Sequence, residues 1–225
     1  MYDMVVDDPY TLFESWYEEA KQSEPTYPDA MTVTTVAENG MPSARILLLK
    51  GLDRRGFVFY TNQRSRKGEQ LAGNPNCALC IFWKTLDRQV RVEGTVSQVS
   101  EAEADAYYAT RPRGSQIGAW ASDQSQPLES RAVLEARIAD LEKRFGEAPV
   151  PRPAHWSGYR VSPVRIEFWR EGKYRLHDRI VYVPDGSGGW TTTQLFPCSR
   201  LPPSAGIRTR CRPAGRLSRL LWLRR

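Results

Sequence analysis

Residues 175–179, Arg-Leu-His-Asp-Arg, form the most chemically capable short segment of this sequence. If the segment is a strand, alternation places Arg175, His177 and Arg179 on one face. Arginine keeps its positive charge and histidine titrates near neutral pH, so such a face could bind an anion or exchange a proton. The alternative interpretation is a charged strand face in solvent, because scattered arginines are common there.

Two further clusters combine cations with hydroxyl groups, the side chains that commonly bind phosphate. The first consists of Arg45, Lys50, Tyr60, Thr61, Ser65, Arg66 and Lys67. The second consists of Tyr107, Arg111 and Ser115, in which positions 107 and 111 share a face if the segment is helical. Each cluster alone also fits surface charge beside a packed aromatic ring. Two phosphate-sized clusters in one small protein suggest two phosphorylated ligands.

The elements that position these residues are predicted to be strands joined by hairpins, with a few helices. Asp8 as N-cap and Pro9 as first residue begin an amphipathic helix. Strands are expected at 31–37, 43–50, 57–61, 77–83, 89–99, 159–170, 174–183 and 190–195, and further helices at 65–71, 101–110 and 128–145. This order predicts a mainly β, α+β protein built on one small antiparallel barrel. Neither of the common glycine-rich nucleotide-binding loops is present.

The chain of 225 residues is 40% hydrophobic and 26% charged, with a net charge of +6. Residues 198–225 hold eight of the 32 basic residues and no acid, which leaves 24 basic against 26 acidic residues in 1–197. The slightly acidic body therefore favours no nucleic-acid partner. The sequence lacks a long apolar run and a basic-then-apolar leader, so we expect a cytoplasmic protein without a membrane partner.

The composition also divides the chain into two parts. We expect a folded domain over 1–197 and a disordered, Arg- and Pro-rich extension over 198–225. The extension is typical of out-of-frame or read-through sequence, although its last residues could also form a basic apolar segment that contacts membranes.

Cys77 and Cys80 form a C-x-x-C pair inside a predicted buried strand. Residues three apart on a strand face opposite ways, whereas a metal or redox pair needs both sulfurs on one side. We therefore interpret the two cysteines as small core residues and predict no metal site.

Seven motifs in order resemble the pyridoxine/pyridoxamine 5′-phosphate oxidase family over about residues 8–197. They are RILLLK at 45–50, FYTN at 59–62, SRK at 65–67, RQV at 88–90, RPRGSQIGAW at 111–120, and IEFW at 166–169 followed by RLHDR at 175–179. The resemblance implies an FMN-dependent, homodimeric split barrel with flavin at the subunit interface. It implies oxidation of pyridoxamine or pyridoxine 5′-phosphate to pyridoxal 5′-phosphate, with O₂ reduced to hydrogen peroxide and ammonia released from the amine.

The resemblance also implies roles for individual residues. The expected FMN-binding residues are Arg45, Ile46, Leu47, Leu48, Leu49, Lys50, Tyr60, Thr61, Arg66 and Lys67, with Gln124 and Ser125 reaching in at the dimer interface and Gln89, Trp169 and Arg179 holding the ring system. The expected substrate-binding residues are Lys50, Tyr107, Arg111, Ser115, Arg175 and His177, the last two being the catalytic pair. Whether His177 exchanges a proton or only orients the substrate stays open.

Two departures from the family pattern concern the N-terminal part. Relatives commonly carry an N-terminal segment that covers the substrate, and we expect this lid to be absent or rebuilt here. Relatives also tend to have an acidic residue where Tyr27 stands, while this chain has Asp29 two residues later. The alternatives to the oxidase are a split-barrel flavin reductase acting on another substrate and a non-catalytic flavin or pyridoxal phosphate carrier. Neither specifically needs a second phosphate pocket.

Overall fold

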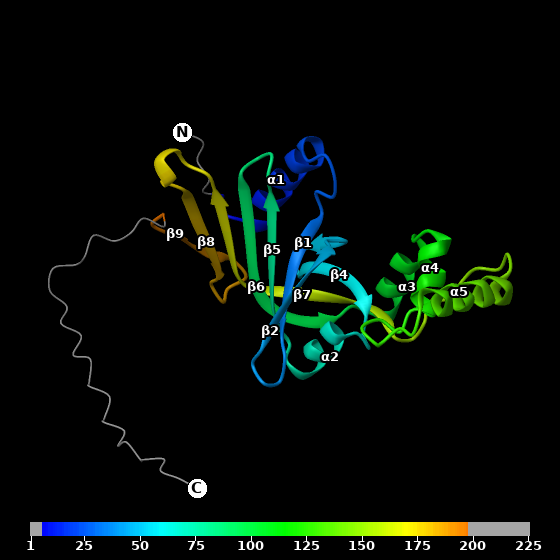
Figure 1. Cartoon of the computed structure of the whole chain (residues 1–225). Coiled ribbons are helices and arrows are strands. Elements are labelled where there is room, and N and C mark those ends of the chain that lie inside the picture. The colour runs from blue at the N-terminus through cyan, green and yellow to red at the C-terminus, as the bar shows by residue number, and fades with distance from the viewer. Residues whose placement is uncertain (1–5, 198–225) are drawn as a thin grey trace, which may run out of the picture.

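A curled antiparallel sheet dominates the computed structural model, which describes residues 6–197 (Figure 1). Its strands are β1 (Ala30–Val36), β2 (Pro42–Leu48), β3 (Gly51–Asp53), β4 (Gly56–Asn62), β5 (Asn76–Trp83), β6 (Arg88–Gln98), β7 (Trp156–Arg170), β8 (Asp178–Pro184) and β9 (Trp190–Gln194). The order is β2-β1-β5-β6-β7-β4-β3, and β8 pairs with both β7 and β9. The predicted antiparallel, mainly β fold is thus confirmed, as a half-barrel flanked by helices.

The core follows from alternation along the strands. In β5, Cys77, Leu79, Ile81 and Trp83 are buried, while the residues between them are exposed or half-buried. Cys80 therefore lies on the face opposite Cys77, as predicted, and both thiols are free. Burial raises the pKa of the Cys77 thiol to about 12, so this sulfur stays protonated.

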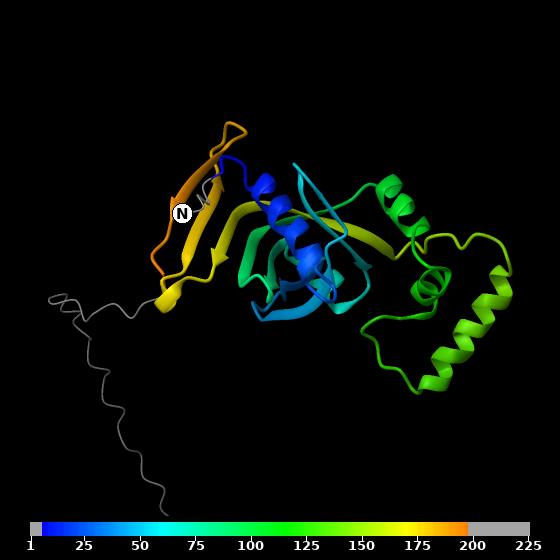
Figure 2. The ribbon, with the colours of Figure 1, turned by 90° about the horizontal axis from the view of Figure 1, so that it is seen from above.

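Helix α1 (Pro9–Ser23) packs on the buried face of the sheet, and Figure 2 shows it crossing the strands. The Asp8 side chain accepts hydrogen bonds from the amides of Tyr10 and Thr11, which confirms the predicted N-cap. Phe13 contacts the edge of Phe57 at 5.1 Å between ring centroids, and Trp16 contacts Phe168 at 5.2 Å. These aromatic contacts join the first helix to the adjacent strands β4 and β7.

A bulge bends the two longest strands, β6 and β7. The register between them shifts between Glu93 and Gly94. A Cβ atom at Gly94 would lie 2.3 Å from the carbonyl oxygen of Ser162, so only glycine fits at this close approach.

The remaining helices are α2 (Arg66–Gly73), α3 (Glu101–Ala109), α4 (Arg113–Ala121) and α5 (Arg131–Phe145). The predicted capping box of Ser100 and Glu103 is present at α3, and Gly146 ends α5 with a positive φ of 47°. Helix α4 was not predicted, and α5 begins at Arg131 rather than Leu128. Both views place α3, α4 and α5 at one end of the molecule and the β8–β9 hairpin at the other.

The prediction of a strand over residues 174–177 is wrong. Lys173–Arg175 form a 3₁₀ turn in which Tyr174 and Arg175 have positive φ values of 59° and 65°, and β8 begins only at Asp178. The tight turn starts at Gly172, where a Cβ atom would lie 1.9 Å from the Leu176 carbonyl oxygen. Arg175, His177 and Arg179 therefore do not share a strand face.

Two further expectations concern the C-terminal extension and membrane-spanning helices. The extension over 198–225 lies outside the described residues. Within residues 6–197, no helix is both long and apolar enough to cross a membrane.

Candidate functional site

Lys67 forms the centre of a polar cluster at the start of α2. The side chain is only 7% exposed, and its Nζ donates to Thr61 Oγ1 at 3.0 Å, Ser65 Oγ at 2.9 Å and Gln124 Oε1 at 3.1 Å. All three acceptors are neutral. Burial lowers the pKa of Lys67 to about 8, and the nearby positive charge of Arg45 acts in the same direction. The ammonium group therefore lacks a counter-charge within the described chain.

Arg45 on β2 has the same kind of surroundings. Its Nη1 donates to the Val33 carbonyl at 3.1 Å and to Thr35 Oγ1 at 2.7 Å, and its Nη2 donates to Ser43 Oγ at 2.7 Å. Burial lowers the pKa of this guanidinium. The side chain of Arg66, the neighbour of Lys67, is exposed at the first position of α2. The structure thus brings together most of the first cluster that the sequence predicted.

The second cluster adjoins the first in one pocket of about 340 Å³. The lining residues are Leu47, Tyr60, Thr61, Asn62, Arg111, Ser115, Gly118, Ala119, Ser122, Gln124 and Trp156. Arg111 lies just beyond α3, and its Nη1 is buried without a hydrogen-bond partner among the described residues. Tyr107 stacks on Tyr60 with 3.9 Å between ring centroids. A buried arginine donor that lines a pocket and has no partner could bind an anionic ligand.

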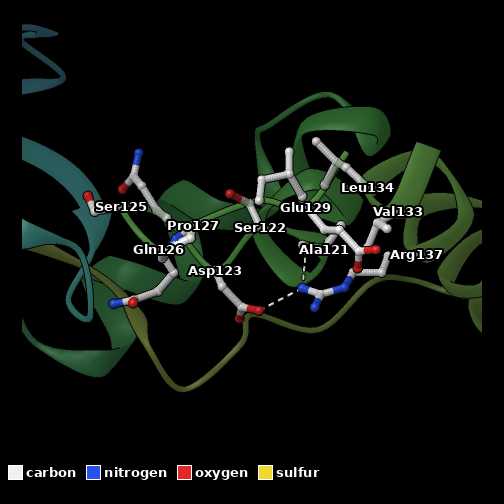
Figure 3. Close-up of a pocket in the computed structure, with 12 residues that line it drawn as sticks. Ala121, Ser122, Asp123, Ser125, Gln126, Pro127, Glu129, Val133, Leu134 and Arg137 are labelled. Carbon is white, nitrogen blue, oxygen red and sulfur yellow. Dashed lines mark hydrogen bonds and ion pairs between the residues drawn. The ribbon is translucent and has the colours of Figure 1, made fainter. Parts of the chain in front are cut away.

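A loop between α4 and α5 carries Gln124 and Ser125, and Figure 3 shows the pocket of about 390 Å³ beside it. Asp123 accepts from Arg137 Nη1 of α5 at 2.6 Å, which ties the loop to that helix. Ser125 has a positive φ of 75°. Gln124 reaches Lys67 of its own chain, so it joins the first cluster without a second copy.

The residues expected to hold the flavin ring lie at the opposite end of β7. Gln89, Trp169 and Arg179 are direct cross-strand neighbours on β6, β7 and β8. The Trp169 ring lies 4.7 Å from the His177 ring between centroids, and the Gly172 amide donates to His177 Nδ1 at 3.3 Å. The turn at 173–175, and not the predicted strand, therefore positions His177 beside Trp169.

Arg179 is neutralised by Glu167, a residue that the sequence reasoning did not assign. Glu167 is 2% exposed and its Oε1 accepts from Arg179 Nε at 2.8 Å and Nη2 at 2.6 Å. Its Oε2 accepts from Arg165 at 2.9 Å. Burial alone would raise the pKa of Glu167, but the hydrogen bonds from Arg179 and Arg165 hold it below its usual value. The carboxylate stays ionised and fixes the Arg179 side chain.

Arg175 lines a third pocket, of about 610 Å³, at the same end. Its lining residues are Leu86, Asp87, Arg88, Arg170, Glu171, Gly172, Lys173, Tyr174 and Arg175. Lys50 lines none of these three pockets, and its Nζ is bound to Asp29 Oδ2 at 2.6 Å. Asp29, which departs from the family pattern, is therefore the ion-pair partner of a predicted phosphate ligand.

The length of β7 separates the two parts of the predicted site. Arg111 lies over Trp156 at the start of the strand, and His177 lies against Trp169 near its end. At about 3.3 Å per residue, the strand between Trp156 and Trp169 runs roughly 40 Å. Figures 1 and 2 show the ends of β7 far apart. Arg111 and His177 of the same chain therefore lie at opposite ends of this strand.

Comparisons with known proteins identify the family of this chain. The family model described as pyridoxamine 5′-phosphate oxidase matches residues 17–145, and the model of the pyridoxine 5′-phosphate oxidase C-terminal dimerisation region matches 156–197. The pyridoxine/pyridoxamine 5′-phosphate oxidase of Caulobacter vibrioides is 59% identical over 191 residues, which cover 85% of this chain and 86% of the relative.

Solved structures show the same fold. PhzG from Burkholderia lata 383, in complex with tetrahydrophenazine-1-carboxylic acid, superposes with a TM-score of 0.82 at 33% identity, covering 87% of this chain and 96% of PhzG. A pyridoxamine 5′-phosphate oxidase-related, FMN-binding protein from Nostoc punctiforme PCC 73102 gives a TM-score of 0.69 at 16% identity, covering 86% of this chain and 100% of its own. The resemblance inferred from the motifs is confirmed: the chain is an oxidoreductase that belongs to the pyridoxamine 5′-phosphate oxidase family.

Proposed function

We propose that this protein binds FMN and oxidises pyridoxamine 5′-phosphate and pyridoxine 5′-phosphate to pyridoxal 5′-phosphate. The acceptor is O₂, which yields hydrogen peroxide, and the amine substrate also yields ammonia. The observation that carries the proposal is the pair of adjoining cation clusters in which Arg45, Lys67 and Arg111 have only neutral hydrogen-bond partners, or none, within the described chain. Two phosphate groups, one of a cofactor and one of a substrate, satisfy both.

The first cluster fits the phosphate of FMN. Lys67, Arg45 and Thr61 offer an ammonium, a guanidinium and a hydroxyl that already lie close together. Arg66 adds an exposed cation at the start of α2, where helix amides also favour an anion. The Gln124 amide lies against Lys67, which leaves its NH₂ group to donate to a phosphate oxygen.

The second cluster fits the phosphate of the substrate. Arg111, Ser115 and Tyr107 surround or adjoin the pocket of about 340 Å³, which lies within the range of roughly 300–1,000 Å³ typical of small-molecule sites. Lys50 would add a further cation only if the substrate phosphate displaced Asp29 from it.

A second copy of the chain completes the site in this proposal. The separation along β7 and the matched dimerisation region over 156–197 support a homodimer in which Arg111 faces the partner's His177. In a twofold dimer each site then combines the Trp156 end of one protomer with the Trp169 end of the other. The ring-holding residues Gln89, Trp169 and Arg179 enter from the second copy together with the catalytic pair.

The flavin, when bound, supplies the two-electron acceptor chemistry. The protein must then stack the substrate ring near it and balance the charge that develops. Arg175 stays cationic and would stabilise negative charge on the substrate. His177 accepts the Gly172 amide proton at Nδ1, so in the neutral ring Nε2 carries the proton. This geometry favours His177 as a hydrogen-bond donor that orients the substrate.

The alternatives remain distinguishable by their ligands. PhzG was solved with a tricyclic carboxylic acid, and the corresponding reaction here would not need the Arg111 cluster to bind a phosphate. A flavin reductase or a non-catalytic carrier would likewise not require the phosphate of pyridoxamine 5′-phosphate.

Anaerobic spectroscopy tests the proposal directly. The purified protein should show the visible absorption of oxidised flavin, and pyridoxamine 5′-phosphate added without oxygen should bleach it. Pyridoxamine without the phosphate is the matched control and should bleach it far more slowly. Equal bleaching by both compounds, or none by either, would remove the phosphorylated vitamer as the substrate.

A further inference from the structure

An aromatic stack forms one wall of the phosphate pocket. Trp156, at the first position of β7, is 6% exposed and lies nearly parallel to Tyr60, with 5.4 Å between centroids and 9° between planes. Tyr107 is parallel to Trp156 within 5° at 6.1 Å. Tyr108 meets the Trp156 ring edge-on at 5.1 Å. Three rings therefore fix the orientation of the indole.

Arg111 lies over this fixed ring. Its guanidinium carbon is 4.6 Å from the Trp156 centroid, within the range of a cation–π contact. Within residues 6–197, no carboxylate forms an ion pair with Arg111. Burial lowers its pKa, which shows that water has been removed from the cation without a counter-charge.

A ring face and a carboxylate hold an arginine with different consequences. A carboxylate would occupy two of the five N–H donors and compete with an incoming phosphate. An aromatic face contacts the plane of the guanidinium and leaves every N–H free at its edge. The buried Nη1 without a partner is the donor that such an arrangement keeps available.

We propose that Trp156 is the positioning residue of the substrate-phosphate subsite: its ring face holds Arg111 so that the guanidinium edge points at a phosphomonoester. The inference rests on the proposed function and deepens it, because it names what selects phosphorylated over unphosphorylated ligands. Trp156 is also a wall of the same pocket, so it limits the space around the phosphate. No motif pointed to this residue, which follows a proline-rich connector in the sequence.

The experiment compares Trp156→Leu, which removes the ring face, with Trp156→Phe, which keeps a smaller one. Isothermal titration of the FMN-loaded protein would measure the binding of pyridoxal 5′-phosphate and of pyridoxal. Trp156→Leu should weaken pyridoxal 5′-phosphate binding roughly 10- to 30-fold, and Trp156→Phe only a few-fold. Pyridoxal and FMN should bind each variant as they bind the wild type, and KM should rise more than kcat falls.

An Arg111→Ala background separates positioning from packing. If Trp156 acts through Arg111, adding Trp156→Leu to Arg111→Ala should weaken phosphate-ligand binding little further. A full additional 10-fold loss would overturn the inference, and so would unchanged binding in Trp156→Leu alone. Should Trp156→Leu fail to retain FMN, the cycle of Trp156→Phe with Arg111→Lys gives the same test. Equal binding of pyridoxal and its phosphate by the wild type would instead overturn the proposed function.

Discussion

Lys67 and Arg111, near one end of β7, and Arg179 and Arg170, near the other, have different kinds of partner. Near Trp156, Lys67 and Arg111 have neutral hydrogen-bond partners or an aromatic face within the described chain. Near Trp169, Arg179 is bound by the buried Glu167, and Arg170 is bound by Asp178 at 2.6 Å. Lys67 and Arg111 keep their capacity for an external anion, whereas Arg179 and Arg170 are held by carboxylates and so hold side chains in place. The partner of a cation, and not its charge alone, distinguishes a phosphate site from a structural ion pair.

Removal of the unpaired cations should have the largest effect. The double substitution Arg45→Ala and Lys67→Ala should weaken FMN binding about 100-fold to 10,000-fold, because each charge-assisted contact to phosphate contributes about 1.5–3 kcal/mol. Fluorescence titration of apoprotein with FMN measures this. The control is Arg131→Ala with Lys143→Ala on the exposed face of α5. It removes the same amount of charge and should change FMN affinity little. Riboflavin bound as tightly as FMN by the wild type would contradict the assignment.

Mixed dimers test whether the two ends work in trans. Arg111→Ala and Arg175→Ala homodimers should each be nearly inactive at low substrate concentration. Mixing them by unfolding and refolding should restore about a quarter of wild-type sites, because half the dimers are mixed and each has one intact site. The rate of pyridoxal 5′-phosphate formation reports the recovery. No recovery, while size measurements show exchanged subunits, would place both ends in one chain.

The lowered pKa of Lys67 predicts a pH dependence confined to the first end. With a pKa of about 8 in the flavin-free protein, Lys67 loses its proton above pH 8, and phosphate binding must then restore it. FMN affinity should therefore fall by up to about tenfold per pH unit above pH 8. Lys67→Arg is the control, since arginine stays charged and should flatten the profile. If the FMN affinity of the wild type did not change from pH 7 to 9.5, Lys67 would not contact the phosphate.

The smallest effect on FMN binding and turnover is expected from removing the arginines that follow residue 197. Residues 198–225 hold eight arginines without an acid, and the matched dimerisation region ends at 197. We propose that residues 1–197 form the complete flavin-binding domain. A chain ending at Pro197 should bind FMN and turn over like the full chain, and any affinity for anionic lipid should disappear. Loss of flavin or of the dimer on truncation would assign the extension a structural role.

Local signals predicted most of the fold. Asp8 before Pro9, the capping box at Ser100 and Gly146 each mark a helix end through contacts within a few residues, and the structure has all three. Helix α4 escaped prediction because Gly114 and Gly118 weaken its helical pattern. The turn at 173–175 was not predicted because the alternation of residue types gives no sign of the positive φ of Arg175.

The site was predictable as separate clusters but not as an arrangement. The sequence placed Lys67 and Arg111 among phosphate ligands from their residue types and neighbours. Their adjoining positions depend on long-range pairing, which aligns Asn62 of β4 with Trp156 of β7. The role proposed for Trp156 depends on its contact with Arg111, which follows α3, and the neutralisation of Arg179 by Glu167 depends on the pairing of β7 with β8. Residue types along the sequence do not show these contacts.

The desolvated cations of Lys67 and Arg111 also make the lifetime of this chain depend on its ligands. Burying a charge without a counter-charge lowers the stability of the folded state, and a bound phosphate would offset this loss. At a ligand concentration of 100 Kd, mass action stabilises the folded state by about 2.7 kcal/mol. Proteases that cleave transiently open chains should then degrade the flavin-free form first, so the cellular amount of the protein would follow flavin supply. Pulse proteolysis with and without FMN measures this protection, and equal cleavage of both forms would exclude it.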